Sequence, residues 1–587
     1  MICVNLHTTK KTTILLKITG IQFSRPKEQR TIYLFYKHKG MKKHIIHFLA
    51  TFLLFLPVAT SSFTTGGLVY GAKALRFTFN DTFTLEEHGD TVEIKAIDFQ
   101  NFSYANLFAL HSEYQNKILV YPKNCTINLS IPSGMYIGNS YHSTPPTIPV
   151  NRVDFNGTTF NVTNTNKDAF IFIISQSSQN LTEMLGKNDI DKGDISYNES
   201  LNKGRILLDI KDARPWAHRT DVNDDRIIYR SDILLLENGK ALNSPIAPYN
   251  TPSTEVSAET EYVRLSNIPG FIKNVTFVRN PQSTKKSYPV YVHHRDGVTL
   301  ENIKVFRDTI GGNNLDGDRC FRIKGCANIT LRNIVVENTY SQSNKYGYAF
   351  ELDNVYNIKC YNIEAYKCKW GVFGSTNVNK AYFENCTLNR LDLHCYGRDF
   401  ECVNCTFQKS NRSDYNSTDI TNFYGTLRYR GCNFNNFQPH VVDVSYNIYT
   451  GCDLIFENCS FNLGNRSYQL VSLSGLAGNT PLRPENRQKC LPNITLRDVT
   501  FSYTGPNDFT TFRIFVANDG VENLGNINRI VLSNVTATRT CILEFDQKNS
   551  ITTATTELPL SREINGGNLT IVEKNATRRA GQYHKYF

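Results

Sequence analysis

Apolar and polar residues alternate in short runs between Arg319 and Phe407, and one pattern returns there four times. Each copy holds a short alternating run, a second run that ends at an asparagine, and a third run after it. The later parts of the copies read ITLRNIVVENT (329–339), IKCYNIEAYKC (358–368), AYFENCTLNR (381–390) and FECVNCTFQKS (400–410). A period of two residues predicts strands, and three strands per repeat without a helical period predict a parallel β-solenoid.

The residue before the third run is asparagine, aspartate or glycine in every repeat. These residues tolerate the left-handed backbone of a tight corner, and stacked asparagine amides bond to one another along a solenoid. The ten corner positions are Asn274, Asn302, Asn333, Asn362, Asn385, Asn404, Gly431, Asn458, Asp498 and Asn534. The residues that follow them are Val275, Ile303, Ile334, Ile363, Cys386, Cys405, Cys432, Cys459, Val499 and Val535. We expect this second set to point into the core.

The repeats predict an all-β chain with about ten or more rungs, where a rung is one turn of the solenoid. Residues 266–545 form the main β-helix in this prediction. Residues 62–164 form an N-terminal cap with the first rungs, and residues 546–587 form a C-terminal cap. Residues 165–265 break the period, and their alternating segments with a turn at Glu237-Asn238-Gly239 predict a strand-and-hairpin insertion at the side.

The chain carries a leader pattern near its start, where two lysines precede an apolar run that ends in small residues. We interpret residues 41–61 as a signal peptide. A signal peptide normally begins at its methionine, here Met41, so residues 1–40 are expected to be an upstream translation artefact. A cytoplasmic extension on an anchored protein is the alternative. The apolar run is short for a transmembrane helix, which predicts a secreted or periplasmic protein with no membrane span after signal removal.

The basic charge of the chain comes mainly from that leader. The chain has 64 Lys and Arg against 53 Asp and Glu, a formal net charge of +11. Residues 1–61 hold ten of the basic and one of the acidic residues, so the remainder has 54 and 52, a net charge of +2. Neither this balance nor any motif indicates a nucleic-acid partner.

Four of the fifteen cysteines, Cys386, Cys405, Cys432 and Cys459, occupy the same position in successive repeats. Stacked neighbours on parallel strands have a poor geometry for disulfides, so we expect a ladder of buried thiols. Bridges elsewhere in the chain stay open. Cys402 and Cys405 lie on a strand and lack the spacing of a zinc site.

These repeats make the chain similar, over about residues 120–545, to the right-handed parallel β-helix superfamily of pectate lyase-like proteins, of the secreted bacterial type that acts on polysaccharides. The insertion, with Trp216, Arg219 and Tyr229, resembles one in several secreted and phage-derived members. The resemblance implies a substrate cleft beside the first strand of each rung. The superfamily includes lyases, hydrolases, epimerases, tailspikes and adhesins, so the likeness bears on the fold more than on the function.

Alternation along the first strands predicts one outward stripe of charged and aromatic side chains. In CFRIKG and AFELDN the core residues are Phe321, Ile323, Phe350 and Leu352. The outward residues are Arg322, Lys324, Glu351, Asp353, Asp392, His394 and Tyr396, with Tyr291 and His293 on one side and Tyr424 and Asp443 on the other.

The densest group in the stripe is Arg390, Asp392, His394, Tyr396 and Arg398. We predict β-elimination of a uronate polymer, such as a glycosaminoglycan or pectin-like chain, with His394 as base and Tyr396 as acid. Arg322, Lys324 or Arg398 would neutralise the charge, and Asp392 would orient His394. Substrate contacts are expected from Asp392, Arg390, Glu351, Asp353, His293, Tyr291, Tyr424 and Trp216. The alternative is an exposed polar ladder that stabilises the sheet.

Two other functions stay open. A glycoside hydrolase needs two carboxylates, which Glu351, Asp353, Asp392, Asp443, Asp316 and Asp318 can supply. The tripeptide RIK at 322–324 precedes Asp392 and His394 instead of following them, and no Gly-His-Gly occurs, so the polygalacturonase pattern is not met. A non-catalytic glycan-binding or surface structural protein is the third possibility.

The sequence predicts no cofactor. Asp316, Asp318 and Glu351 are weak calcium candidates, because the usual spacings are absent. The segment His293-His294-Arg295 and the pair Trp216 and His218 are secondary site candidates. The oligomeric state and the identity of the sugar are not predicted.

Overall fold

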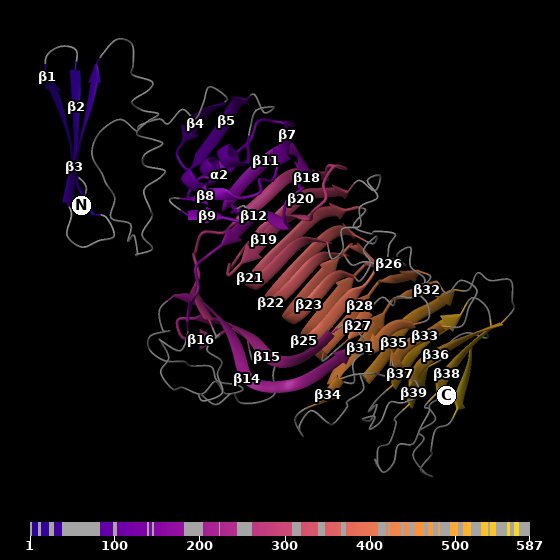
Figure 1. Cartoon of the computed structure of the whole chain (residues 1–587). Helices are drawn as coiled ribbons and strands as arrows, with labels where there is room; N and C mark the ends of the chain where they lie inside the picture. The colour runs from indigo at the N-terminus through magenta and orange to yellow at the C-terminus, as the bar shows by residue number, and fades with distance from the viewer. Residues whose placement is uncertain are drawn as a thin grey trace. The chain divides into compact units, whose positions relative to one another are not determined.

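A computed structural model gives the fold of the chain (Figure 1). The residues that it describes are 3–9, 13–22, 29–37, 83–97, 103–137, 140–143, 146–180, 204–221, 224–243, 261–307, 318–337, 347–365, 371–408, 418–420, 423–435, 440–444, 451–462, 468–473, 479–481, 493–502, 509–517, 530–537, 540–546, 560–563 and 569–574. The predicted signal peptide, residues 41–61, lies outside them.

The chain folds into a parallel β-helix, which confirms the predicted all-β class (Figure 1). Four long strands turn corners and contribute to more than one face: β21 (Asp318–Val336), β22 (Gly347–Ala365), β23 (Gly371–Glu384) and β25 (Leu391–Val403). Each pairs with the next in parallel, and the register is continuous except for one shift between β23 and β25.

Three faces result from this winding. The first face also contains β10 (Ile148–Pro149), β12 (Ala169–Ser175), β19 (Ser287–His293), β27 (Thr418–Ile420), β30 (His440–Val444), β33 (Tyr468–Leu473), β36 (Phe509–Ala517), β38 (Thr540–Asp546) and β40 (Leu569–Lys574). The second contains β6 (Ile118–Val120), β11 (Arg152–Thr163), β18 (Phe271–Arg279), β20 (Thr299–Arg307), β28 (Phe423–Arg430), β31 (Gly451–Glu457), β35 (Asn493–Ser502), β37 (Ile530–Ala537) and β39 (Leu560–Glu563). The third contains β7 (Thr126–Ser130), β24 (Thr387–Leu388), β26 (Thr406–Gln408), β29 (Asn433–Asn435) and β32 (Ser460–Asn462), together with the parts of β11, β18, β20, β35 and β37 that follow their corner residues.

All ten predicted corner residues adopt the left-handed backbone, with φ between 50° at Asn534 and 64° at Gly431. The expected amide ladder is present, since Asn302 donates to Asn274 at 2.8 Å, Asn333 to Asn302 at 2.9 Å and Asn362 to Asn333 at 2.8 Å. The ten residues that follow the corners are all buried. These corners fix where the second face ends and the third begins.

Aromatic rings and thiols stack inside the solenoid. The rings of Phe321, Phe350 and Phe373 lie parallel, with centroids 4.8 Å and 4.6 Å apart, close to the spacing between strands. Cys386, Cys405, Cys432 and Cys459 are buried free thiols, as predicted. Their Sγ atoms donate to backbone carbonyls, and burial raises the pKa of Cys386 and Cys432 well above the ordinary thiol value.

One end of the solenoid carries a hairpin of β4 (Phe83–His88) and β5 (Thr91–Ile97) and the helix α2 (Tyr104–Glu113). Ser103 caps the helix by accepting from the Asn106 amide, and Leu107, Leu110 and His111 are buried. In the part of the chain that the structure describes, no helix has the length and apolar character needed to cross a membrane. At the other end β39 and β40, within the range predicted as a cap, continue the second and first faces.

The insertion forms a separate antiparallel sheet beside the solenoid (Figure 1). Its strands are β13 (Gln179–Asn180), β14 (Arg205–Asp221), β15 (Asp224–Glu237), β16 (Lys240–Ala241), β17 (Glu261–Arg264) and β34 (Asn479–Pro481). The sheet begins at β13, because β12, within the range predicted for the insertion, pairs with β19 in the solenoid. The strand β34 comes from a much later loop and pairs with β14 at Ala217–Arg219.

A second compact unit comprises residues 1–74 and 134–146. Its described strands are β1 (Cys3–Thr9), β2 (Thr13–Gln22) and β3 (Gln29–Lys37) in one antiparallel sheet, with β8 (Met135–Ile137) and β9 (Ser140–His142) in a two-stranded one.

Candidate functional site

The parallel register arranges the outward positions of the first face in two columns. One column contains, rung after rung, Tyr291, Arg322, Glu351, Gly374, Asp392, Asp419 and Asp443. The other contains His293, Lys324, Asp353, Thr376 and His394. Neighbours within a column are about 4.8 Å apart along the solenoid. Asp419 is a column member that the sequence analysis did not single out.

Four side chains gather on two adjacent rungs of these columns: Tyr291, His293, Arg322 and Lys324. The Tyr291 and His293 rings are stacked, with centroids 5.1 Å apart and an interplanar angle of 18°. The Arg322 guanidinium lies over the Tyr291 ring, 5.7 Å from its centroid. Lys324 is the direct register partner of His293. This Tyr/His/Arg/Lys group, which we call the quartet, is partly exposed.

The surroundings of the quartet shift the pKa values of its two titratable rings, His293 and Tyr291. Burial, followed by the neighbouring His294 and Lys324, lowers the pKa of His293 to about 3. Burial raises the pKa of Tyr291 to about 12, although the Arg322 charge opposes that change. In the free protein at neutral pH the imidazole is therefore uncharged and the phenol keeps its proton.

The next rung places a carboxylate opposite each cation of the quartet. Arg322 Nε lies 3.5 Å from Glu351 Oε2, and Lys324 Nζ lies 3.9 Å from Asp353 Oδ2. The four side chains are between 22% and 29% exposed, so both ion pairs are open to solvent. Pairs of this kind contribute little to stability, and a bound anion can compete for the cations.

Aromatic side chains extend the quartet toward the earlier rung. The Phe170 ring lies 4.8 Å from the Tyr288 ring and 4.9 Å from the Tyr291 ring, measured between centroids. All three are half-buried on the first face. Sequence analysis did not single out Phe170 or Tyr288, because an isolated aromatic residue in a strand is usually core.

Asp392 occupies an outward position, as predicted, but its carboxylate is covered and is not exposed on the face. Its side chain is only 1% exposed, and Arg390, predicted to contact substrate, is 5% exposed. Arg390 donates to Asp392 Oδ1 at 3.0 Å, and the Tyr348 hydroxyl donates to Oδ2 at 2.6 Å. Gly374 makes this possible, because a methyl group there would lie 2.7 Å from the Tyr348 ring. The ring crosses the glycine rung and covers the carboxylate.

The register of β25 does not keep the rest of the predicted group, His394, Tyr396 and Arg398, in regular alternation. The register shifts between the pairs Thr376–His394 and Val378–Gly397, so β25 carries an extra residue near Tyr396. Arg398 pairs with Asn379 and Tyr424 at the next corner, off both columns, and forms an ion pair with Asp399 at 3.2 Å.

Several predicted contacts concern side chains that the structure does not describe: His394, Tyr396, Tyr424, Asp443 and Trp216. The backbone puts Trp216 at an irregular point of β14, between Pro215 and Ala217. Of the weak calcium candidates, Asp316 lies outside the described residues and Glu351 faces Arg322.

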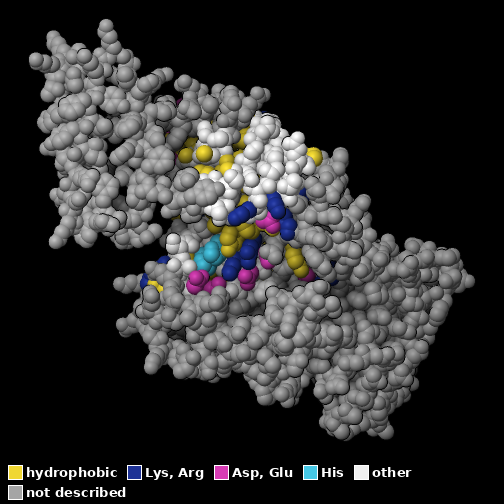
Figure 2. Space-filling model, viewed as in Figure 1, with side chains coloured by type: hydrophobic (Ala, Val, Ile, Leu, Met, Phe, Trp, Pro, Cys, Tyr) yellow, Lys and Arg dark blue, Asp and Glu magenta, His cyan; other side chains and the backbone are white. Residues whose placement is uncertain are grey.

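The insertion lines one side of the first face. Leu207, Ile233 and Leu235 pack on Ala327, with Tyr356 against the same cluster, at the corner where the first face ends. Arg205 of β14 forms an ion pair with the buried Asp296 at 3.0 Å. Figure 2 shows a hollow on the molecular surface in which basic, acidic and histidine side chains gather. The insertion thus borders the first face that carries the quartet, and we call the surface between the quartet and the insertion the groove, with the insertion as its wall.

The solved structures to which this chain is similar share little sequence identity with it. No family model and no curated protein matches the sequence. Among solved structures, tailspike gp49 of Pseudomonas phage LKA1 is 11% identical, with a TM-score of 0.44 and coverage of 78% of this chain and 77% of that one. The Gp54 tailspike of Acinetobacter baumannii bacteriophage AP22, solved with a capsular saccharide, is 13% identical, with a TM-score of 0.45 and coverage of 77% and 75%. Tailspike gp61 of Pseudomonas phage phi297 is 12% identical, with a TM-score of 0.45 and coverage of 81% and 76%. The fold assignment rests on the strand register described above.

Proposed function

We propose that this protein is an exported polysaccharide lyase that cleaves an acidic, uronate-containing polysaccharide by β-elimination. The observation that carries the proposal is the quartet, in which an imidazole, a phenol and two cations lie together on the first face. β-Elimination needs a base, an acid and a group that stabilises the developing anion. Tyr291, His293, Arg322 and Lys324 supply all three within two rungs.

In the proposed reaction each of these groups has one role. The carboxylate of a bound uronate sits between Arg322 and Lys324, whose charges neutralise the anion that develops as the adjacent carbon loses its proton. His293 accepts that proton, and the C–H electron pair becomes the new carbon–carbon double bond. The bond to the glycosidic oxygen breaks, and the Tyr291 hydroxyl donates a proton to the leaving oxygen. The products are an unsaturated uronate end and a new hydroxyl end.

This assignment moves the base and the acid away from His394 and Tyr396. His394 lies three rungs from Lys324 in the same column, which corresponds to about 14 Å. A cation at that distance cannot contact the carboxylate of a sugar whose proton His394 removes. His293 is the direct neighbour of Lys324, so one sugar can meet both.

A glycoside hydrolase is the second candidate, and a specific observation favours it. Glu351 and Asp353 lie two residues apart on one strand face, so their Cα atoms are about 7 Å apart, and both side chains are partly exposed. Inverting hydrolases hold the carboxyl groups of their acid and base about 6.5–9.5 Å apart, a separation that side chains starting from these two positions can reach. In that reaction Arg322 and Lys324 would be the counterions of the two carboxylates.

Product analysis on a panel of glycosaminoglycans, alginate and pectins tests the proposal. A lyase produces the ultraviolet absorbance of the unsaturated uronate together with new reducing ends. We expect Tyr291→Phe and His293→Ala to lower kcat by about 10²- to 10⁴-fold. Lys324→Met should lose activity as well, whereas Lys359→Met, a matched change on the exposed second face, should not.

The outcomes separate the two enzymes. Reducing ends without the absorbance, abolished by Glu351→Gln or Asp353→Asn, would establish the hydrolase. Full lyase activity in the Tyr291→Phe and His293→Ala variants would move the chemistry elsewhere on the face. Binding without cleavage of any polymer would leave a glycan-binding protein.

A further inference from the structure

Asp209, Glu261 and His294 converge from three segments where the insertion meets the solenoid. Asp209 on β14 and Glu261 on β17 are directly opposite partners in an antiparallel ladder, and His294 follows β19. One donor atom of each residue lies within 4.8 Å of the other two. His294 Nε2 is 3.4 Å from Glu261 Oε2, and Asp209 and His294 are 2% and 1% exposed.

The corner after the first-face strands explains why Asp209 lies there. His294, Gly325, Asn354 and Asn377 occupy one position on successive rungs, with φ of 52°, 59°, 53° and 53°. Asn377 donates to Asn354 Oδ1 at 2.6 Å, and Asn354 donates to Asp209 Oδ1. Gly325 has no side chain with which to continue this ladder. Asp209, which comes from the insertion, takes that place.

Gly325 also brings two of the donor atoms together. A methyl group at this glycine would lie 2.5 Å from His294 Cδ2 and 3.0 Å from Nε2, and 3.7 Å from Asp209 Oδ2. The imidazole nitrogen and the second carboxylate oxygen therefore meet over the bare glycine. The Asn354 amide holds Oδ1, and outer hydrogen bonds of this kind orient the carboxylates that bind metals.

We propose that Asp209, Glu261 and His294 bind a divalent transition-metal ion of the Zn²⁺ type. Imidazole with carboxylates suits zinc, whereas calcium prefers a shell of oxygens. Zinc bonds of about 2.1 Å in a tetrahedron separate neighbouring donors by about 3.4 Å, the spacing between His294 and Glu261. Glu261 is 39% exposed on its side chain, which leaves the fourth position toward water.

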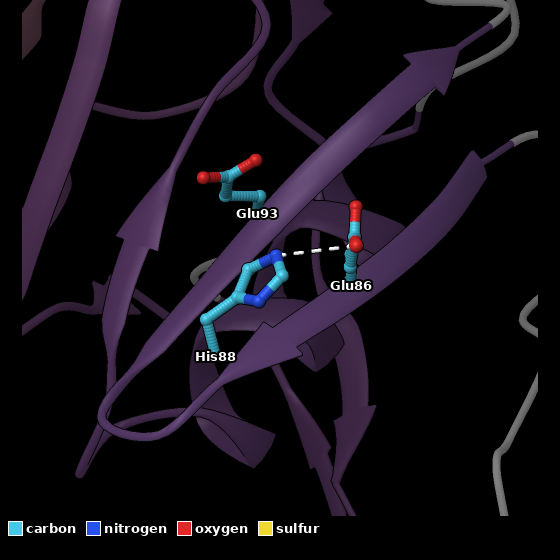
Figure 3. A group of neighbouring side chains, drawn as sticks. All are labelled: Glu86, His88 and Glu93. Atoms are coloured by element: carbon cyan, nitrogen blue, oxygen red, sulfur yellow. Dashed lines mark ion pairs between the residues drawn. The ribbon is translucent and has the colours of Figure 1, made fainter.

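A second group of two carboxylates and one histidine differs from this site in having a lysine between the carboxylates. Glu86, His88 and Glu93 lie together on the β4–β5 hairpin, where Glu86 and Glu93 are also cross-strand partners (Figure 3). There Lys95 forms ion pairs with both carboxylates, 3.0 Å from Glu86 Oε2, and Glu86 and His88 are exposed while Glu93 is partly exposed. An ammonium ion occupies the position between those carboxylates. At the insertion, the buried His294 imidazole faces the carboxylates of Asp209 and Glu261.

Such an ion would join β14 and β17 to the solenoid corner that follows the quartet, and so would hold the groove wall in place. The proposal does not depend on the reaction that the groove performs. A ligand that binds the folded chain alone raises its free energy of unfolding with the logarithm of one plus the ratio of ligand concentration to Kd. Metal content and thermal stability are therefore readouts besides activity.

Metal binding by the full chain tests the site. The protein is stripped with a chelator, titrated with Zn²⁺ by calorimetry, and its metal content is measured by mass spectrometry after dialysis. We expect one ion per chain and a rise in Tm with Zn²⁺. His294→Asn should abolish both and still fold, because asparagine occupies this left-handed corner on two other rungs. Asp209→Asn, which can still accept from Asn354, should do the same.

The matched control is His88→Asn in the exposed group, which should leave the stoichiometry unchanged. Loss of the bound ion in His88→Asn, with retention in His294→Asn and Asp209→Asn, would overturn the assignment. Failure of the unaltered chain to bind Zn²⁺ would overturn it too.

Discussion

Asp392 and Arg390 form a buried charged pair at the start of the first-face strand β25. Each is at most 5% exposed, and Tyr348 reaches over Gly374 to complete the hydrogen bonding of the carboxylate. Removing one partner of such a pair leaves the other charge buried without its counterion, which costs more than the pair itself contributes. This group therefore stabilises the first face at the rung that contains β25.

Arg390→Met tests that role. We expect the free energy of unfolding to fall by about 3–5 kcal/mol, because the Asp392 carboxylate stays buried. Tyr348→Phe should cost about 1–3 kcal/mol, since one hydrogen bond to a charged group is lost. Chemical denaturation measures both. Arg430→Met, at the exposed ion pair with Glu401, is the matched control and should change stability by at most about 1 kcal/mol. Equal costs at the two arginines would contradict a buried role for Arg390.

The corner ladder is the element that repeats along the solenoid. Asn333 donates to Asn302 and accepts from Asn362, and its φ is 52°. A residue at this position has two tasks, which are to adopt the left-handed backbone and to bond to its neighbours. Glycine fulfils the first task alone, as Gly431 does in its own rung.

Two substitutions at Asn333 separate these tasks. Asn333→Gly should lower the free energy of unfolding by about 1 kcal/mol, because it loses the amide bonds and keeps the backbone conformation. Asn333→Ala should lower it by about 2 kcal/mol or more, because alanine has neither the conformational freedom of glycine at positive φ nor the polar side chain that lets asparagine tolerate it. Denaturant titration gives both values. An alanine variant as stable as the glycine variant would show that strain at the corner is negligible.

The local chemistry of those corners made the rungs predictable. Asparagine, aspartate and glycine at one position, followed by a small or apolar residue, define the turn and the inward direction without any distant contact. Asp392 could not be placed in the same way, because alternation puts it outside and a tyrosine from two rungs earlier covers it. The place of Asp209 depends on the missing side chain of Gly325, a contact across more than a hundred residues. Long-range packing of this kind leaves no local pattern.

The whole molecule couples the solenoid to its insertion at several points. Arg205 and Asp209 bind the corners at Asp296 and Asn354, and Leu235 packs on the corner at Ala327. At the far end β34 pairs with β14. The groove wall is thus tied to rungs that are distant in sequence, which gives it a fixed place beside the quartet.

The N-terminal end of the solenoid carries a buried histidine, His111. His111 on α2 is 2% exposed, lies among Tyr121, Phe155 and Phe172, and has a ring nitrogen 2.9 Å from the Tyr121 hydroxyl. Burial lowers its pKa to about 3. Its pKa in the unfolded chain is about 6.5, so between these values the unfolded state binds a proton that the folded state does not.

The stability contributed by a neutral His111 is therefore complete above about pH 6.5 and is lost as the pH falls toward about 3. The expected slope from this residue is about 1.4 kcal/mol per pH unit. His111→Gln removes the titration, so its free energy of unfolding should depend less on pH, and its difference from the unaltered chain should change steadily across this window and stay constant above it. Denaturation at a series of pH values measures the difference. The control is His88→Gln at the exposed hairpin, which should leave the dependence of stability on pH unaltered. Parallel curves for His111→Gln and the unaltered chain would contradict the prediction, because they would mean that the imidazole takes up its proton without unfolding the cap.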